Sequence, residues 1–294
     1  MTDRQTTTSV TPPIAPDVAA IRGYVRRWRA AGQRVALVPT MGALHEGHLA
    51  LVDAALSLAD LVVVSIFVNP AQFAPHEDFD QYPRDLEGDA AKLAERGVSV
   101  IYAPDRSIMY PDGHQTSVSL GAVAEPMEGA HRPIFFTGVA TVVTKLLLQV
   151  EPHIAVFGEK DYQQLAVIKQ MVRDLDIDVE ISGRPTEREA DGLAMSSRNA
   201  YLSQAERQVA PRLNAELQAI AQALANGQPF APLQEASVKA LVGAGFDQPD
   251  YLDLRDAETL APMEQAGDRP GRLLVAAKLG KTRLIDNIPV SPIS

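Results

Sequence analysis

Two histidines in the first fifth of the chain, His45 and His48, lie in a stretch whose residue types suit phosphate chemistry. Pro39–Leu49 has the sequence PTMGALHEGHL, and its glycines would let a ligand approach the backbone closely. Spaced three residues apart, the imidazoles would point to the same spot from a first helical turn. They could donate hydrogen bonds to an anionic phosphorus centre and stabilise charge on a leaving group. We therefore predict a nucleotide site here.

The residues on either side of this stretch predict the elements that would position it. Arg34–Val38 is typical of a short buried strand, Leu49–Ala59 of a buried helix, and Leu61–Val68 of a parallel strand covered on both faces. This order is that of a βαβ unit. The turn would lead into a helix N-terminus, where free amide groups and the helix dipole favour phosphate.

A zinc site is one alternative role for the two histidines. A zinc-protease helix requires His-Glu-x-x-His, whereas only Glu46 and Gly47 separate the two histidines here, which excludes that site. A glycine-bearing turn with two incidentally exposed histidines stays open on this stretch alone. The sequence His-Glu-Gly-His resembles the His-x-Gly-His signature of the nucleotidyltransferase superfamily, whose members act at the α-phosphate of ATP.

Composition narrows the class of protein. The chain has 294 residues, 46% hydrophobic and 22% charged, as in a globular protein with a real core. It contains no cysteine, which excludes disulfides and thiolate nucleophiles and suits a reducing compartment such as the cytoplasm. No apolar run is long enough to cross a membrane, and the start, 1–18, is polar without a secretory core. A formal net charge of −10 argues against nucleic acid as a partner.

Polar residues also follow two later strands of the pattern. Asn69 and Gln72 come just after Leu61–Val68, and Lys160 and Asp161 follow the predicted strand His153–Phe157 through Gly158. Open α/β sheets bind ligands beyond the carboxyl ends of their strands. We expect the amides to contact substrate, the lysine to meet phosphates and the aspartate to meet ribose hydroxyls.

The remaining pattern predicts an α/β fold. Strands alternate with helices up to about residue 185, which implies a parallel sheet; the further elements expected there are helices Val18–Ala31, Asp85–Arg96 and Phe135–Val150 and strands Val98–Tyr102 and Ile177–Ser182. Residues 103–134 are expected to be a loop with a strand fragment at Ser117–Leu120. Asp85, Glu87 and Asp89 are expected to be solvated charge at a helix start, with a magnesium contact as the alternative.

After residue 185 the pattern changes, and we predict a smaller α+β domain. Its expected elements are a loop at Arg184–Asn199, helices at Ser203–Asn226 and Pro232–Ala244, and strands at Tyr251–Leu254, Leu273–Leu279 and Thr282–Asn287. The predicted domains are therefore 1–185, which carries the nucleotide site, and 186–294; the family resemblance described next implies that the first binds ATP and pantoate and that the second acts as a lid.

Four segments together closely resemble the pantoate–β-alanine ligase (pantothenate synthetase) family: Pro39–Leu49, Ser65–Phe73, Gly158–Leu165 and Met195–Asn199. The resemblance implies a Rossmann-like nucleotidyltransferase domain, a small mobile C-terminal α+β domain and a homodimer. It also implies a ligase that forms a C–N bond by condensing pantoate with β-alanine. ATP and Mg²⁺ would be used, AMP and diphosphate released, and a pantoyl adenylate formed on the way.

The resemblance also assigns residues, one by one. The catalytic set would be His48, as proton donor, with His45, Lys160 and Arg198. ATP would be bound by Met41, Gly42, Ala43, Leu44, His45, Glu46, Gly47, His48, Gly158, Glu159, Lys160, Asp161, Glu187, Met195, Ser196, Ser197 and Arg198. Pantoate would be bound by Gln72, Gln164, Asn69, Met41 and Phe73, and magnesium would meet Asp89.

Two positions depart from the family pattern. Glu187 stands where the family has an aliphatic side chain and contacts ATP through the backbone, and Phe135 stands where histidine is common. Two alternatives remain at this point. The chain could be another adenylyl-transferring enzyme, such as a different nucleotidyltransferase or a fragment of an aminoacyl-tRNA synthetase. A synthetase should carry a basic surface for tRNA, which the net charge of −10 does not favour. The chain could also be a catalytically silent ATP-binding module. Intact His45, His48, Lys160 and Arg198 favour an active enzyme.

Overall fold

The structure is a computed structural model that describes residues 11–74, 77 and 79–293. The chain forms two compact units, each built from three segments. The first comprises Met1–Ser119, Thr137–Phe157 and Val172–Arg184, and the second comprises Leu120–Phe136, Gly158–Met171 and Pro185–Ser294. Two segments before residue 185 thus group with the C-terminal part of the chain. The division into domains at residue 185 stays a prediction. Residues 1–10 of the polar start lie outside the described residues.

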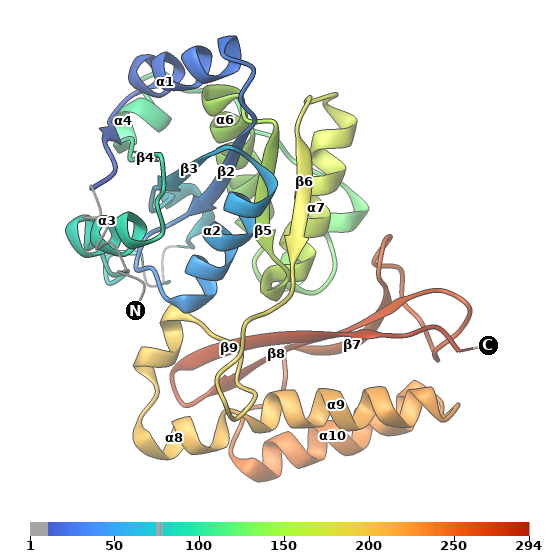
Figure 1. The fold of residues 1–294 in the computed structure, drawn as a ribbon. Helices are drawn as coiled ribbons and strands as arrows, with labels where there is room; N and C mark the ends of the chain where they lie inside the picture. Colours follow the sequence, from blue (N-terminus) through green and yellow to red (C-terminus); the bar gives the residue numbers. More distant parts are fainter. Residues whose placement is uncertain (1–10, 75–76, 78, 294) are drawn as a thin grey trace, which may run out of the picture. The chain divides into compact units, whose positions relative to one another are not determined.

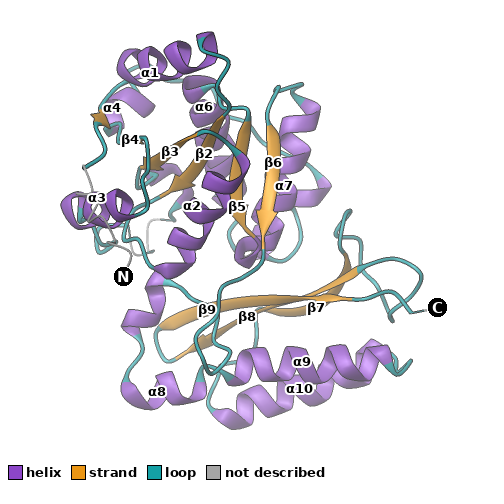
Figure 2. Cartoon of the chain, in the orientation of Figure 1, coloured by secondary structure: helices purple, strands orange, loops and turns teal. Residues whose placement is uncertain are grey.

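A six-stranded parallel sheet forms the first unit (Figures 1 and 2), with strand order β1-β4-β3-β2-β5-β6. The strands are β1 (Ile14–Ala15), β2 (Val35–Thr40), β3 (Leu61–Ile66), β4 (Val100–Tyr102), β5 (Ile154–Gly158) and β6 (Glu180–Arg184). The central position of β2 follows from its sequence, because Val35–Val38 are all fully buried. The predicted α/β fold with a parallel sheet is confirmed.

Helices cover both faces of this sheet. Helices α2 (Glu46–Leu58) and α3 (Leu86–Glu95) share a core with alternate strand residues such as Ala36, Val38 and Ile101. Helix α6 (Phe135–Val150) reaches the opposite face, where the Tyr102 hydroxyl donates to Gln149 Oε1 at 2.7 Å. The other helices of this part are α1 (Val18–Ala30) and the short α4 (Arg106–Met109).

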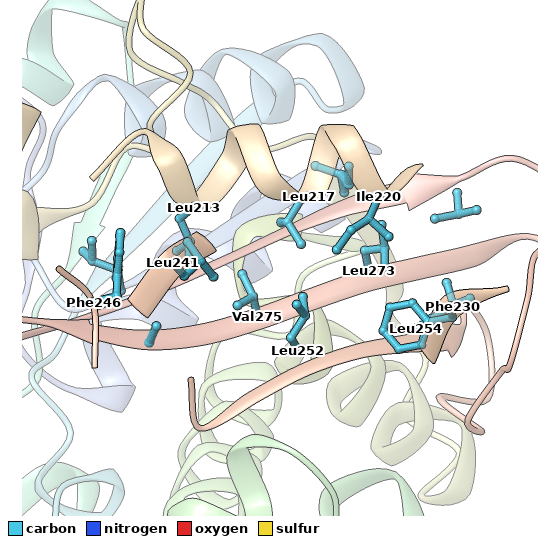
Figure 3. Packing of buried hydrophobic residues seen from close by; sticks show 14 of the residues in the cluster. Leu213, Leu217, Ile220, Phe230, Leu241, Phe246, Leu252, Leu254, Leu273 and Val275 are labelled. Atoms are coloured by element: carbon cyan, nitrogen blue, oxygen red, sulfur yellow. The ribbon is translucent and has the colours of Figure 1, made fainter. Parts of the chain in front are cut away.

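A three-stranded antiparallel sheet forms the centre of the second unit, with order β7-β8-β9. Its strands are β7 (Tyr251–Asp256), β8 (Gly271–Leu279) and β9 (Thr282–Val290). Leu252, Leu273 and Val275 pack against α9 (Arg212–Ala225) and α10 (Phe230–Ala244) on one face, as Figure 3 shows. This is the small α+β assembly that the sequence predicts.

The second face of the C-terminal sheet is also covered. Leu274 of β8 points away from α9 and packs with Met127 and Leu260. Val123, Tyr162 and Ala166 join this cluster, so the cover comes from 120–136, which includes α5 (Glu128–His131), and from the start of α7 (Tyr162–Asp174). Burial on both faces explains why these segments group with the C-terminal part.

Several local predictions were wrong, among them the loop over 103–134, which contains the short helices α4 and α5. Ser117–Leu120 is not a strand but part of an irregular segment. The predicted helix Ser203–Asn226 is divided into α8 (Gln204–Val209) and α9, because Pro211 lies between them and cannot continue the α8 hydrogen bonds. Helix α2 begins at Glu46 rather than Leu49, so both histidines belong to its first turn.

Candidate active site

The turn between β2 and α2 has a backbone that its sequence explains. Gly42 has φ +84° and Ala43 has φ +53°, both in the left-handed region. A Cβ atom on Gly42 would lie 3.0 Å from Asp89 Oδ2 and 3.1 Å from Ile66 Cγ2. Only glycine combines that conformation with that close approach. The turn is therefore tightly fixed where the sequence predicts the nucleotide site.

Asp89 of α3 holds this turn from outside. Its Oδ2 accepts from the Ala43 amide at 2.9 Å and its Oδ1 from the Leu44 amide at 2.8 Å. Lys92, one helical turn further along α3, donates to the Leu44 carbonyl at 2.6 Å. The prediction of solvated charge is thus wrong for Asp89, which is 1% exposed because its carboxylate serves backbone groups of the turn.

The two histidines lie together at the start of α2. His45 is the N-cap residue and His48 is three positions later, with ring centroids 4.1 Å apart. The backbone N–H of His45 donates to Nδ1 of His48 at 3.4 Å. An Nδ1 that accepts a hydrogen bond places the proton of the neutral ring on Nε2. Nε2 is then the donor atom of the neutral His48 ring, and its role as proton donor stays a prediction.

Glu46 and Gly47 lie between the two histidines, and Gly47 is half-buried. The Glu46 side chain is exposed and pairs with Arg96, at the end of α3, at 3.1 Å, while Arg96 also pairs with Asp53 of α2. Asp89, Lys92 and Arg96 thus form one side of α3 directed at the turn and at α2. The contacts of Glu46 connect it to the helix, and a contact with ATP stays a prediction.

Asn69 and Gln72 follow β3 and bond to each other. Asn69 Nδ2 donates to Gln72 Oε1 at 3.0 Å and to the Gly138 carbonyl at 3.1 Å. Asn69 Oδ1 accepts from the Tyr110 hydroxyl at 2.7 Å, and burial raises the pKa of Tyr110 to about 12, so this donor stays protonated. Because both amide protons of Asn69 are committed within the chain, Asn69 orients Gln72.

The two apolar residues predicted to contact pantoate have different environments. Met41 is half-buried, and its Sδ lies 3.1 Å from Gln72 Nε2, so these two predicted pantoate residues are adjacent. Phe73 is 7% exposed and packs edge-on against Phe79 and Tyr82, with centroids 5.4 and 6.1 Å away. Phe73 is thus part of an aromatic core beside the site.

The second strand-to-helix junction predicted to bind ATP, Gly158–Asp161, lies in the second unit. Gly158 ends β5, and Glu159–Asp161 form a single 3₁₀ turn before α7. Asn287 of β9 donates to the carbonyls of Glu159 and Lys160 at 2.9 and 2.8 Å. Arg272 of β8 pairs with Glu159 at 3.0 Å. The side chain of Glu159 therefore bonds within the protein.

Two adjacent glutamines on α7 have separate tasks. Gln164, the predicted substrate residue, is half-buried, while Gln163 is 3% exposed. Gln163 accepts from the Glu128 amide at 3.1 Å and donates to the carbonyls of Val123 and Pro126 at 3.1 and 2.7 Å. Gln163 thus ties 120–136 to the turn of helix that carries Gln164.

The predicted loop Arg184–Asn199 is folded back on itself. The Met195 amide donates to the Glu187 carbonyl at 2.9 Å, which brings two predicted ATP-binding residues side by side. Arg188 makes a bidentate pair with buried Asp286 of β9 at 2.8 and 2.9 Å. Because the Glu187 side chain is exposed, its charge is accommodated without burial.

Ser196, Ser197 and Arg198 follow directly after this fold. Ser196 caps the 3₁₀ segment Ser197–Tyr201, and its Oγ accepts from the Arg198 amide at 3.3 Å.

Phe135, the second position that departs from the family pattern, is 7% exposed, and the Arg132 guanidinium lies 3.8 Å from the centroid of its ring. Its surroundings are those of a packed aromatic side chain.

Several polar residues that support the predicted site in the two units were not singled out from the sequence. Thr40 donates to the Ser65 carbonyl at 2.8 Å and accepts from the Gly42 amide at 3.2 Å, at the edge of the sheet. Tyr110, Gln163, Arg272 and Asn287 act at long sequence separations. Thr40 and Gln163 lie inside the named segments Pro39–Leu49 and Gly158–Leu165, so only these two had a sequence signal that could have been used.

Comparisons with known proteins agree with this geometry. A sequence profile of the Pantoate-beta-alanine ligase family matches residues 13–289. Pantothenate synthetase of Caulobacter vibrioides is 56% identical over 281 residues, covering 95% of this chain and 99% of that protein. That of Paramagnetospirillum magneticum is 57% identical over 279 residues, covering 95% and 98%.

Solved structures give the same result. Pantothenate synthetase of Thermus thermophilus has a TM-score of 0.88 and 46% identity, covering 95% of this chain and 100% of that one. The Francisella tularensis pantoate-beta-alanine ligase, complexed with beta-gamma ATP and beta-alanine, has a TM-score of 0.79 and 34% identity, covering 94% and 97%. With its two histidines on a glycine turn at the carboxyl edge of a parallel sheet, the chain belongs to the pantoate–β-alanine ligase family.

Proposed function

We propose that the chain forms pantothenate in two steps, through a pantoyl adenylate. The overall reaction is that of its family, an ATP-dependent ligase reaction that forms a C–N bond between pantoate and β-alanine. The observation that carries the proposal is the pair His45 and His48 on the fixed glycine turn, with their rings 4.1 Å apart and His48 Nδ1 accepting from the His45 amide.

The first step needs position and charge rather than an enzyme nucleophile. A carboxylate oxygen of pantoate attacks the α-phosphorus of ATP, the bond from that phosphorus to the bridging oxygen breaks, and diphosphate leaves. His48 donates a hydrogen bond to the phosphate oxygens as negative charge shifts towards diphosphate, with His45, Lys160 and Arg198 as further donors. Fixed donors of this kind stabilise developing charge without reorganising.

In the second step, the neutral amine of β-alanine attacks the acyl carbon of the adenylate. The bond from that carbon to the phosphate oxygen breaks, AMP leaves, and the nitrogen loses a proton to give the amide. The adenylate would hydrolyse in water, so closure of 195–198 over the nucleotide is part of the proposal.

The substrate residues divide into direct and indirect contacts. Gln72 and Gln164 are proposed to bind pantoate through their amides, with Met41 supplying apolar contact. Asn69 is proposed to act through Gln72, because its own donors already bond to Gln72 and Gly138. Phe73 is proposed to support this pocket from its aromatic cluster.

Magnesium is proposed only as the ion that accompanies ATP. Asp89 does not fit a direct ligand, because it is 1% exposed and each oxygen already accepts a backbone amide. Within residues 11–74, 77 and 79–293, no cluster of three His, Asp or Glu side chains could hold a metal. Mg²⁺ is commonly bound largely by substrate phosphates, which agrees with this assignment.

A homodimer and a cytoplasmic location complete the proposal, and both rest on the family. None of the described helices is long and apolar enough to cross a membrane. The dimer is tested by light scattering at micromolar concentration, where a mass of one chain would contradict it.

The decisive experiment is exchange of labelled diphosphate into ATP without β-alanine. If the carboxylate is activated first, exchange should proceed and should require pantoate. Exchange that requires β-alanine would contradict the two-step order. Exchange that needs no pantoate would contradict the substrate assignment, and an absence of exchange under all conditions would identify a silent ATP-binding module.

A further inference from the structure

Strand β9 carries two adjacent buried polar residues that the proposed reaction does not use. Asp286 is 4% exposed and Asn287 is 3% exposed. As neighbours on a strand they point to opposite faces of the sheet. Asp286 meets Arg188 and Asn214 of α9, whereas Asn287 meets the turn Glu159–Asp161. Burying a polar side chain costs free energy unless the side chain is hydrogen-bonded, so the partners of these two residues indicate why they are buried.

All hydrogen-bonding atoms of the Asn287 side-chain amide have partners, two in the Glu159–Asp161 turn and one in β8. Its Nδ2 donates to the carbonyls of Glu159 and Lys160 at 2.9 and 2.8 Å. Its Oδ1 accepts from Arg272 Nε at 2.6 Å. An arginine can only donate, so this contact fixes which side of the amide is oxygen and directs the NH₂ group to the two carbonyls.

Arg272 is itself held in place. Its Nη2 pairs with Glu159 Oε2 at 3.0 Å, and its guanidinium lies 4.1 Å from the centroid of the Tyr162 ring. The side chain is 8% exposed. Arg272 therefore contacts residues on both sides of Lys160 while it orients Asn287.

The turn that receives these bonds is too short to fix itself. Glu159–Asp161 is one 3₁₀ turn of three residues, and Gly158 before it offers no side-chain cap. Such turns have few internal hydrogen bonds of good geometry. Two bonds from one rigid amide to consecutive carbonyls define the backbone from which the Lys160 side chain extends.

We propose that Asn287, oriented by Arg272, is a positioning residue that fixes the backbone of Lys160 for ATP binding. The inference rests on the proposed role of Lys160 at the ATP phosphates. It gives the C-terminal sheet a part in the first half-reaction, because β8 and β9 hold one of its phosphate-binding residues.

The test is Asn287→Asp in the full-length protein. The carboxylate keeps the shape and the acceptor for Arg272 but places oxygen against two carbonyl oxygens. We expect the Kd for ATP, measured by calorimetry without pantoate, to rise about tenfold or more. The KM for pantoate in the exchange reaction should change less than the Kd for ATP. Asn226→Asp, the same exchange at an exposed position after α9, should leave both constants unchanged.

A double-mutant comparison separates positioning from a general loss of structure. If Asn287 acts through Lys160, Asn287→Asp should have little further effect on ATP affinity in a Lys160→Ala background. An equal loss in both backgrounds, or unchanged ATP affinity in the single variant, would overturn the inference. Should Asn287→Asp fail to fold, Arg272→Lys, which loses the bond to Oδ1 but keeps its charge, should raise the Kd for ATP in the same Lys160-dependent way.

The proposed function is judged separately by the wild-type protein. If wild-type protein shows no pantoate-dependent exchange, the proposed function fails before any variant is measured. If wild-type protein exchanges and Asn287→Asp binds ATP equally well, only the positioning inference fails.

Discussion

The two strand-to-helix junctions that carry the predicted phosphate-binding residues are built differently. The first, Met41–His48, uses left-handed backbone at Gly42 and Ala43 and is held by Asp89, 45 residues from Leu44. The second, Gly158–Asp161, has extended backbone at Gly158, with φ −79°, and is held by Asn287, 127 residues from Lys160. The first is therefore fixed by a neighbouring helix of its own sheet, and the second by a separate sheet.

This difference has a consequence for substitutions. A change in the first junction should affect the chemistry with little effect on the C-terminal sheet, because its supports are α3 and the end of β3. A change in the C-terminal sheet should affect Lys160 through Asn287.

The largest effect is expected for His48→Ala. The variant should fold normally, because a half-buried residue of a first helical turn contributes little packing, but adenylate formation should fall by about 10²–10³. The measurement is pantoate-dependent exchange, with circular dichroism as the check on folding. Ser57→Ala, exposed near the end of the same helix, is the control. Near-normal exchange by folded His48→Ala would remove His48 from its proposed role.

Asp89→Asn should have the next largest effect. It keeps the shape but turns an NH₂ group towards a backbone amide, which leaves one buried donor unpaired at a cost of about 1–3 kcal/mol. We expect a lower melting temperature and a higher KM for ATP.

Asp85→Asn is the matched control, because Asp85 caps the same helix and asparagine caps equally well. If Asp89 instead binds magnesium, the activity of Asp89→Asn should recover as the Mg²⁺ concentration is raised. Such recovery would contradict the positioning role of Asp89 at the first junction.

Smaller effects are expected for the two amides, one in each unit. Gln72→Ala and Gln164→Ala should each raise the KM for pantoate by roughly 2- to 12-fold, the equivalent of about 0.5–1.5 kcal/mol for a neutral hydrogen bond. The Kd for ATP should stay nearly constant in both. Initial-rate kinetics with each substrate varied provide the measurement, and a loss of ATP affinity in either variant would argue that the amide supports its junction instead.

The last prediction concerns stability in acid rather than catalysis, at Glu128, which joins 120–136 to the C-terminal sheet. Burial acts to raise its pKa, but hydrogen bonds and charge from Arg283, with Tyr251 and Arg132, outweigh this and lower the pKa below 4.5. The stabilisation is therefore complete above pH 4.5 and is lost as the pH falls through the lowered value.

We expect acid unfolding, followed by circular dichroism, to be less steep in Glu128→Gln over that acid range. Glu235→Gln, at an exposed pair with Lys239, should unfold like the wild type. Parallel curves for Glu128→Gln and wild type would show that this ion pair does not set the acid stability of the second unit.

The α/β fold and the first junction could be predicted from the sequence alone. Buried aliphatic runs such as Val35–Val38, glycine at position 42 and histidines three residues apart are local signals, because strand burial, left-handed backbone and a shared helical turn each depend on neighbours in the chain. Four spaced motifs were also enough to indicate the family.

The residues that support this chemistry become visible only in the folded chain. Nothing in the sequence near Asp89 distinguishes a solvated helix-start carboxylate from one that accepts the amides of Ala43 and Leu44. Likewise, an asparagine in a predicted strand gives no sign that it bonds two carbonyls 127 and 128 residues away. Hydrogen bonds between distant segments depend on how sheets and helices pack, and that packing is set by the whole chain rather than by any one stretch.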